Sequence, residues 1–279
     1  TIATVAINTI LAPIFIFMFD WGIRGAAIAT VSAQVIALLW QLKQFNNANE
    51  LLHFRRGIFR LKRKIVFDSL AIGMSPFLMN LAACLIVILI NQGLKKYGGD
   101  LAIGAFGIVN RLVFIVVMIV MGLNQGMQPI AGYNFGAKLY DRVNKVLKLT
   151  IIYATCVTTF GFLVGMLAPN LVVGIFTSDA ELTELSATGL RITVMFFPII
   201  GFQMVTSNFF QSIGMAGKAI FLSLTRQMLI LLPCLLILPH FFGVAGVWYS
   251  MPVSDLLASL IALVMLVYQF RKFKTAAAH

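Results

Sequence analysis

Long apolar runs follow one another through this sequence, and they restrict the folds open to it more than any other feature. A helix that crosses the hydrocarbon core of a bilayer needs about 20 mostly apolar residues. Eight segments meet or approach this length: residues 2–19, 26–42, 65–94, 101–128, 147–167, 187–213, 219–239 and 244–270. The pattern therefore predicts an all-α integral membrane protein with eight transmembrane helices.

The composition agrees with a membrane protein and argues against a soluble domain. Hydrophobic residues make up 60% of the chain and charged residues only 11%, whereas a soluble domain would carry far more charge. The net charge of +12 could suggest a nucleic-acid partner. The charges gather in alternate loops rather than on one folded face, so we expect membrane lipid as a partner and no nucleic acid.

The basic stretch at residues 43–64 sets the orientation of the predicted spans. It reads KQFNNANELLHFRRGIFRLKRK and contains one acidic residue, Glu50. Basic loops beside membrane spans stay on the cytoplasmic side. We therefore expect a cytoplasmic linker, either an amphipathic helix on the inner leaflet or a disordered loop. The later loops on the same side are also basic: Lys138, Arg142, Lys145, Lys148, Lys218, Arg271, Lys272 and Lys274. An opposite loop is acidic, with Asp179, Glu181 and Glu184, and the alternation predicts a cytoplasmic C-terminus.

A weak internal repeat predicts how the chain is divided. The motif GIRG at residues 22–25 resembles GVAG at residues 243–246, and Gln34 and Asp255 each lie twelve residues after the first glycine. If the motifs occupy equal places in two parallel lobes, residues 1–42 are the last two helices of an N-terminal lobe. Residues 65–270 would then be a complete C-terminal lobe of six helices. Residues 43–64 would link the lobes, residues 271–279 would form a cytoplasmic tail, and four helices would precede Thr1. A chance match of the two motifs is the alternative.

The segment at residues 101–128 places polar and adaptable side chains on one helical face. An arginine, two methionines and two amides recur there at spacings of three and four, and such a stripe does not suit contact with lipid. The segments at residues 65–94 and 187–213 offer similar faces. We therefore expect a substrate cavity lined by Asn80, Arg111, Phe114, Met118, Met121, Gln125, Met204 and Asn208. Ordinary helix packing, with amides bonding across helices, is the alternative for each of these residues.

Charges inside the predicted spans are rare, and Arg226 and Asp255 lie deepest. An isolated charge within a membrane is costly, so we expect these two to pair with each other or to bond to amides such as Gln227. Their role is either structural or one of ion coupling. We expect no enzyme activity and no metal site, because no nucleophile–base pair or metal-ligand cluster has a convincing spacing.

One long motif resembles the signature of a known family. Residues 122–138 read GLNQGMQPIAGYNFGAK and are followed by Asp141-Arg142-Val143. This run resembles the sequence after the eighth helix of the MATE (multidrug and toxic compound extrusion) family. Further matches lie at residues 23–30, 208–214, 223–227 and 246–255. The resemblance covers residues 1–270, is greatest for bacterial multidrug exporters, and identifies the segments as helices five to twelve of a fragment.

The resemblance implies a secondary-active antiporter of a bacterial inner membrane. Such a protein exports cationic, amphiphilic drugs in exchange for H⁺ or Na⁺ by alternating access between two six-helix lobes, and it needs no cofactor. We also expect a monomer, and a fragment that is inactive alone. Two departures stand out: Ala12 replaces an Asp that relatives carry before Pro13, and residues 187–213 lack the acidic cation ligand that some relatives place there. A flippase for lipid-linked precursors, from the same superfamily, is the alternative; it would need a larger cationic cavity.

Overall fold

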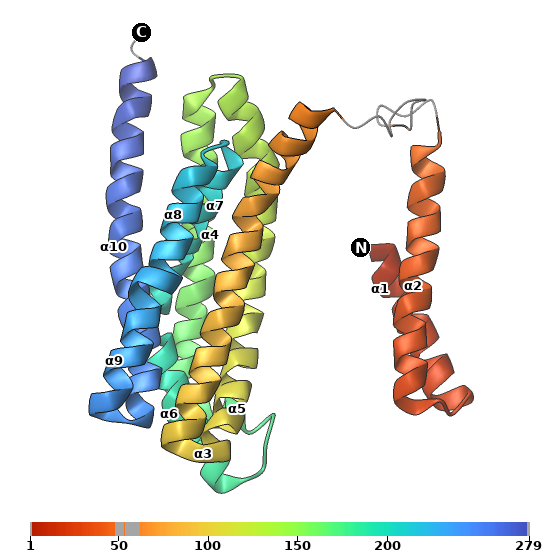
Figure 1. Ribbon diagram of the computed structural model, residues 1–279, viewed down its shortest axis with the longest axis vertical. Coiled ribbons are helices and arrows are strands. Elements are labelled where there is room, and N and C mark those ends of the chain that lie inside the picture. The colour runs from red at the N-terminus through yellow and green to blue at the C-terminus, as the bar shows by residue number, and fades with distance from the viewer. Residues whose placement is uncertain (1, 48–52, 54–61, 278–279) are drawn as a thin grey trace. The chain divides into compact units, whose positions relative to one another are not determined.

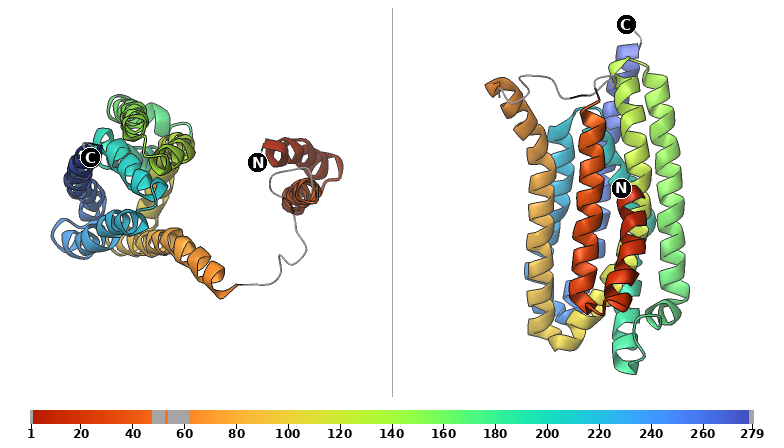
Figure 2. Two further views of the ribbon diagram at one scale, coloured as in Figure 1. Left: turned by 90° about the horizontal axis from the view of Figure 1, so that it is seen from above. Right: turned by 90° about the vertical axis from the view of Figure 1, so that its right-hand side faces the viewer.

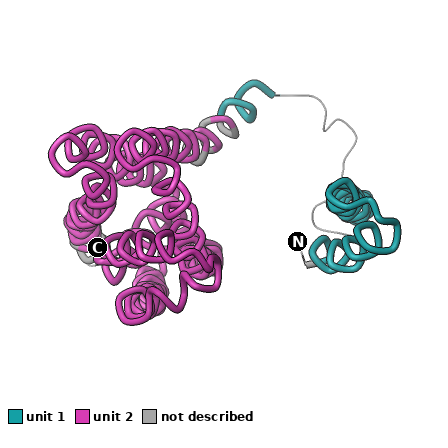
Figure 3. Tube along the Cα trace, turned by 90° about the horizontal axis from the view of Figure 1, so that it is seen from below, with its two compact units in different colours: residues 1–68 teal, residues 69–279 magenta. Residues whose placement is uncertain are grey.

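The computed structural model describes residues 2–47, 53 and 62–277, which form helices joined by short turns (Figure 1). No strand occurs among these residues, so the predicted all-α class is confirmed for the described chain. Most of the predicted basic linker falls on residues 48–52 and 54–61, and its expected amphipathic helix therefore lies outside the described residues. The chain divides into two compact units, Thr1–Asp68 and Ser69–His279 (Figure 3).

The first unit is a pair of packed helices. Its elements are α1 (Ile2–Pro13), the π-helix η1 (Ile14–Met18) and α2 (Gly22–Phe45). The α-helix changes to a π-helix after Pro13, whose ring removes a backbone donor. The buried face of α2 consists of small residues, one per turn: Gly25, Ala29, Ala33 and Ala37. Small residues let membrane helices approach closely.

The second unit holds the remaining helices, which run side by side (Figure 2). In chain order they are α3 (Arg63–Gly136, which begins just before the unit boundary), α4 (Tyr140–Leu167), α5 (Pro169–Val173), α6 (Ala180–Val194), α7 (Phe197–Ser212), α8 (Ala216–Leu224), the π-helix η2 (Thr225–Leu231), α9 (Leu232–Phe242) and α10 (Val244–Ala277). Gly99 interrupts α3 with a φ of 68°, and the chain reverses direction there (Figure 1). Glycine suits this position because it adopts a positive φ without a steric penalty.

The helices account for all eight predicted spans. Within the described residues, five helical stretches are long and apolar enough to cross a membrane, and the bent pair α6–α7 makes a sixth. One of the five, Phe77–Gly136, contains the reversal at Gly99 and so supplies two predicted spans. Ala3–Met18 is a shorter apolar helix at the place of the first predicted segment. The bend between α6 and α7 is 55° and lies just before Pro198, and proline is a common cause of such bends.

The two ends of the second unit differ in charge. One end holds the turn after α3, the connection between α7 and α8 and the C-terminal end of α10, and it includes Lys138, Arg142 and Lys218 (Figure 1). The other end holds Gly99 and the acidic loop before α6, where Asp179 Oδ1 accepts a hydrogen bond of 2.8 Å from the backbone N–H of Leu182. This bond caps the helix. The basic and acidic loops thus lie at opposite ends of the bundle, in agreement with the predicted alternation.

The two glycine motifs of the predicted repeat adopt the same local geometry. Gly22 and Gly243 both have a positive φ, 50° and 56°; Gly22 is the first residue of α2, and Gly243 directly precedes α10. Three residues later, Gly25 and Gly246 approach the backbone of the preceding helix. A Cβ on Gly25 would lie 2.5 Å from the carbonyl oxygen of Phe15, and one on Gly246 would overlap the carbonyl group of Leu238. The same local geometry therefore lets two consecutive helices pack closely at each end of the described chain.

Candidate functional site

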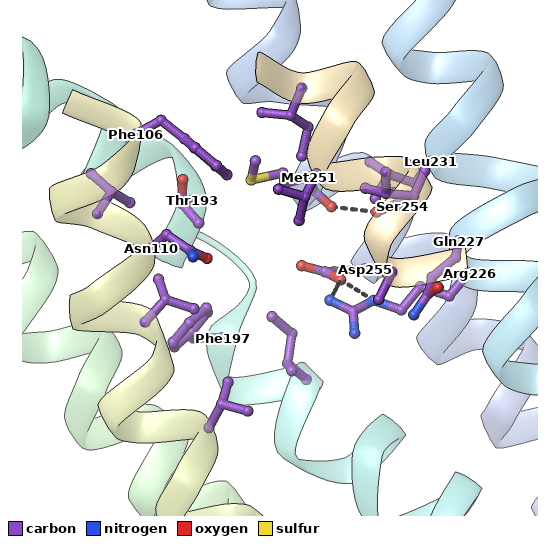
Figure 4. Close-up of a pocket in the computed structure, with 18 of the residues that line it drawn as sticks. Phe106, Asn110, Thr193, Phe197, Arg226, Gln227, Leu231, Met251, Ser254 and Asp255 are labelled. Atoms are coloured by element: carbon purple, nitrogen blue, oxygen red, sulfur yellow. Dashed lines mark hydrogen bonds and ion pairs between the residues drawn. The ribbon is translucent and has the colours of Figure 1, made fainter. Parts of the chain in front are cut away.

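A partly open cavity of about 250 Å³ lies between helices of the second unit, and we call it the interior cavity (Figure 4). Side chains from α3, α6, α7, η2 and α10 line it. One side combines aromatic and polar residues, namely Phe106, Asn110, Thr193 and Phe197. The facing side carries Arg226, Gln227, Ser254 and Asp255. The cavity is therefore largely apolar, with a few polar groups that converge from different helices, as is typical of small-molecule sites.

Local helix geometry explains why these residues meet. On the second half of α3, residues 106, 109, 110, 113 and 117 recur at spacings of three and four and share one face. The break before Pro198 brings Thr193, at the end of α6, and Phe197, at the start of α7, to the same cavity. The π-helix η2 supplies Arg226, Gln227 and Leu231. π-helical turns are rare and occur frequently at functional sites.

An ion pair between η2 and α10 forms the most polar part of the cavity wall. Nε and Nη2 of Arg226 each lie 2.7 Å from Oδ1 of Asp255. The Asp255 side chain is only 5% exposed, whereas that of Arg226 is 32% exposed. Both contacts use the same carboxylate oxygen, and the second oxygen points into the cavity (Figure 4). The predicted pairing of the two intramembrane charges is confirmed.

Gln227 follows Arg226 in η2, and its side-chain oxygen is an unpaired hydrogen-bond acceptor. Its Oε1 atom is buried and has no hydrogen-bond partner. A buried carbonyl oxygen without a donor costs free energy, and such groups are uncommon in folded proteins. Because protein atoms cover it completely, this oxygen does not open onto the cavity.

The predicted cavity residues occupy two different places. Met204 lines the interior cavity, and Asn208 donates a hydrogen bond of 3.0 Å to the Met204 carbonyl oxygen. Exposed positions on the surface of α3 are occupied by the other six: Asn80, Arg111, Phe114, Met118, Met121 and Gln125. The exposed fractions of Phe114, Met118 and Met121 are 52%, 55% and 49%. These six residues are exposed on α3 and are not among the residues that line the cavity.

Sequence reasoning missed four polar residues of the interior cavity: Asn110, Thr193, Gln227 as a lining group, and Ser254. A signal for Asn110 exists, because it lies four residues after Phe106 and three before Val113 on a regular helical face. Thr193 and Ser254 carry no such signal, since small hydroxyl residues are common on membrane helices and bond to their own backbone. Here Thr193 donates to the carbonyl oxygen of Gly189 and Ser254 to that of Met251.

Comparison with known families and proteins gives a consistent result. The family model described as MatE matches residues 71–236. The multidrug export protein MepA of Staphylococcus aureus (strain MSSA476) is 29% identical over 274 residues, which cover 97% of this chain and 59% of that protein. MepA of Staphylococcus saprophyticus is 26% identical over 270 residues, with the same coverage. The chain thus spans about three fifths of the length of the curated relatives that it matches.

Solved structures agree with this similarity. The MATE multidrug transporter DinF-BH is 35% identical and superposes with a TM-score of 0.85, over 98% of this chain and 61% of that one. A multidrug resistance MATE family transporter in an outward-facing conformation is 22% identical, with a TM-score of 0.86 over 98% of this chain and 62% of that one. Both superpositions include nearly all of the chain.

Proposed function

The chain belongs to the MATE family, and from this premise we propose that it acts in multidrug efflux as a secondary-active antiporter. It would export cationic, amphiphilic compounds across a bacterial cytoplasmic membrane in exchange for H⁺ or Na⁺. The observation that carries the proposal is the similarity, over 97% of the chain, to proteins named as multidrug exporters. As a member of a transporter family, the chain is not an enzyme, in agreement with the sequence prediction.

Alternating access supplies the proposed mechanism. Residues 1–42 would belong to one lobe and residues 65–270 to the other, joined by residues 43–64 and followed by a tail at residues 271–279. The local geometry shared by the two glycine motifs supports this division. In repeat-built transporters, one repeat rocks against the other around a site near the middle of the membrane. Ion binding or protonation would shift the balance between outward-open and inward-open states.

The stripe on α3 is the proposed contact surface for substrates. Arg111 and Gln125 are exposed on a helix surface that would otherwise face lipid, where charges and amides are costly. Met118 and Met121 lie between them, and methionine adapts to apolar partners of varied shape. Phe114 and the two methionines suit the flat apolar body of an amphiphilic drug, and the amide oxygen of Gln125 can accept a hydrogen bond from its polar group.

We expect Met121→Trp combined with Gln125→Trp to reduce ethidium efflux several-fold, because two indole rings would fill the proposed substrate surface. The measurement is ethidium efflux from cells that express the complete gene product, with expression matched by immunoblot. Val264→Trp is the control, since Val264 is 69% exposed on α10, away from the stripe. Unchanged efflux in the double variant would contradict the proposed surface.

The charge asymmetry of the second unit predicts its orientation in the membrane. After removal of the native cysteines, Ser178→Cys in the acidic loop should react with a membrane-impermeant maleimide in intact cells. Arg142→Cys, at the basic end, should react only after the membrane is permeabilised, because basic loops stay in the cytoplasm. Labelling of both positions in intact cells would contradict the predicted topology and the cytoplasmic C-terminus.

A further inference from the structure

We propose that the exposed face of α6 binds the headgroup of a zwitterionic phospholipid whose nitrogen carries N–H groups, such as phosphatidylethanolamine. The residues of this face line neither the interior cavity nor the stripe on α3. The inference goes beyond the proposed function, because it concerns the lipid around the protein and holds whatever the protein exports. Three properties of the face support it: its polar residues, its apolar surroundings and the order of its charges.

A polar depression of about 580 Å³ lies on α6 and the adjoining short helix α5. Its charged and hydrogen-bonding side chains are those of Asn170, Thr183, Glu184, Thr188 and Arg191. Glu184, Thr188 and Arg191 recur at spacings of four and three, so they share one face of the helix, and all three are exposed. Among the described residues, neither Glu184 nor Arg191 forms an ion pair, so both charges are available to a ligand.

The surroundings of the polar depression are apolar and exposed, as on a surface that faces lipid. α6 packs against α4, α5 and α10. Leu167, at the end of α4, is 80% exposed, and Leu171, in α5, is 72% exposed. Met195 directly follows α6, lies four residues after Arg191 on the same face, and is 44% exposed. Charged groups bordered by exposed apolar side chains suit the boundary between headgroups and hydrocarbon, where an arginine keeps its methylenes in apolar surroundings.

The order of the charges along α6 matches the order of the groups in a phospholipid. Glu184 and Arg191 are seven residues apart, a rise of about 10.5 Å along the helix. Glu184 is nearer to the acidic loop at the end of the bundle, and Arg191 lies deeper. In a phospholipid the phosphate is attached to the glycerol, and the amine lies beyond it, further from the acyl chains. Arg191 would therefore bind the phosphate and Glu184 the ammonium group, while an acyl chain runs along Met195.

The other charges near the site favour a zwitterionic headgroup over an anionic one. Asp179 caps α6 and Glu181 lies in its first turn, so three carboxylates accompany the single guanidinium of Arg191. A headgroup with a net negative charge would be repelled. The carboxylate of Glu184 can accept hydrogen bonds from N–H groups, and such charge-assisted bonds are strong. The quaternary ammonium group of phosphatidylcholine has no N–H group and cannot form them.

Native mass spectrometry of the complete gene product in a mild detergent measures the binding of single lipid molecules. The protein is titrated with phosphatidylethanolamine, phosphatidylcholine and phosphatidylglycerol that carry the same acyl chains. Phosphatidylethanolamine is expected to occupy one saturable site and to bind about tenfold more tightly than either of the other lipids. This is the effect of about one hydrogen bond to a charged group.

Two substitutions separate the two contacts. Glu184→Gln should remove most of the preference for phosphatidylethanolamine over phosphatidylcholine, because the carboxylate is lost. Arg191→Gln should weaken the binding of phosphatidylethanolamine and phosphatidylcholine alike by about tenfold, because both carry the phosphate, and Arg191→Lys should restore part of the affinity. Glu181→Gln and Arg142→Gln are matched controls at exposed positions that do not line the polar depression, and they should leave phosphatidylethanolamine binding unchanged.

Three results would overturn the inference. The first is equal binding of the three lipids, because the headgroup would then not be recognised. The second is a preference for phosphatidylethanolamine that persists in Glu184→Gln. The third is an effect of Arg142→Gln as large as that of Arg191→Gln, because binding would then depend on overall charge. Circular dichroism and size exclusion check that each variant keeps its helical fold. Ethidium efflux in the stripe variants bears on none of these outcomes, so the two proposals fail separately.

Discussion

Replacement of Arg226 with Met is expected to destabilise the protein by about 3–5 kcal/mol, the cost of removing one partner from a buried ion pair. The variant leaves the Asp255 carboxylate in the bundle without its cation, and that side chain is only 5% exposed. Thermal unfolding of the purified protein in detergent, followed by loss of the monodisperse peak on size exclusion, measures the effect. Arg142→Met removes an exposed arginine at the basic end and should cost less than about 1 kcal/mol.

A double variant separates the ion pair from its packing. Arg226→Met combined with Asp255→Leu removes both charges and keeps apolar bulk at the contact between η2 and α10. Replacement of a buried ion pair by apolar side chains is often neutral or stabilising. We therefore expect the double variant to recover most of the lost stability. A single variant as stable as the parent, or a double variant as damaged as the single one, would contradict a structural role for the pair.

Gly246→Ala is expected to destabilise the second unit by about 1–3 kcal/mol, because overpacking at a rigid contact forces the backbone to shift. The new methyl group would overlap the carbonyl group of Leu238 and lie 2.7 Å from the nitrogen of Pro239. Both neighbours are backbone atoms and cannot rotate away. The same thermal assay measures the loss, and Gly25→Ala should act in the same way in the first unit, where Phe15 is the neighbour.

Gly107→Ala provides the matched control. Apart from its own helical turns, no atom lies within 4 Å of the position that its Cβ would occupy, and the residue sits within α3. Alanine favours a helix over glycine by up to about 1 kcal/mol, so this change should be neutral or stabilising. If Gly246→Ala and Gly107→Ala lower the melting temperature equally, the loss of stability reflects a general intolerance of the helices to substitution. It would then not be due to the close contact at Gly246.

The sequence predicts the spans and the ion pair because each follows from a strong local constraint. Lipid contact requires long apolar runs, so the length of each segment is visible without any knowledge of its neighbours. Deep charges within the membrane need partners, and Arg226 and Asp255 are the deepest of the few that the spans contain. Pro198 indicates a bend because its ring cannot donate the backbone hydrogen bond that a straight helix needs.

The interior cavity could not be predicted in the same way, because it depends on contacts between helices. Periodicity shows that Arg111 and Met118 share a face, but Asn110 and Val113 also share one, and only packing decides which face lines a cavity. The stripe is visible in the sequence because it carries a charge. The residues that enclose the cavity are mostly apolar and resemble the rest of the membrane helix. Thr193 and Asp255 meet there from segments about sixty residues apart, which no local pattern reveals.

The π-helix η2 makes one part of its span tolerant of a change in length. A π-turn takes in one residue more than an α-turn, because its hydrogen bonds reach one residue further along the chain. Deletion of Leu229 would therefore let ordinary α-helical bonding continue from α8 into α9 while both keep their buried faces. Deletion of a residue within α9 would instead rotate every later side chain of that helix by about 100°. Among homologous sequences, insertions and deletions in this span should concentrate at Thr225–Leu231.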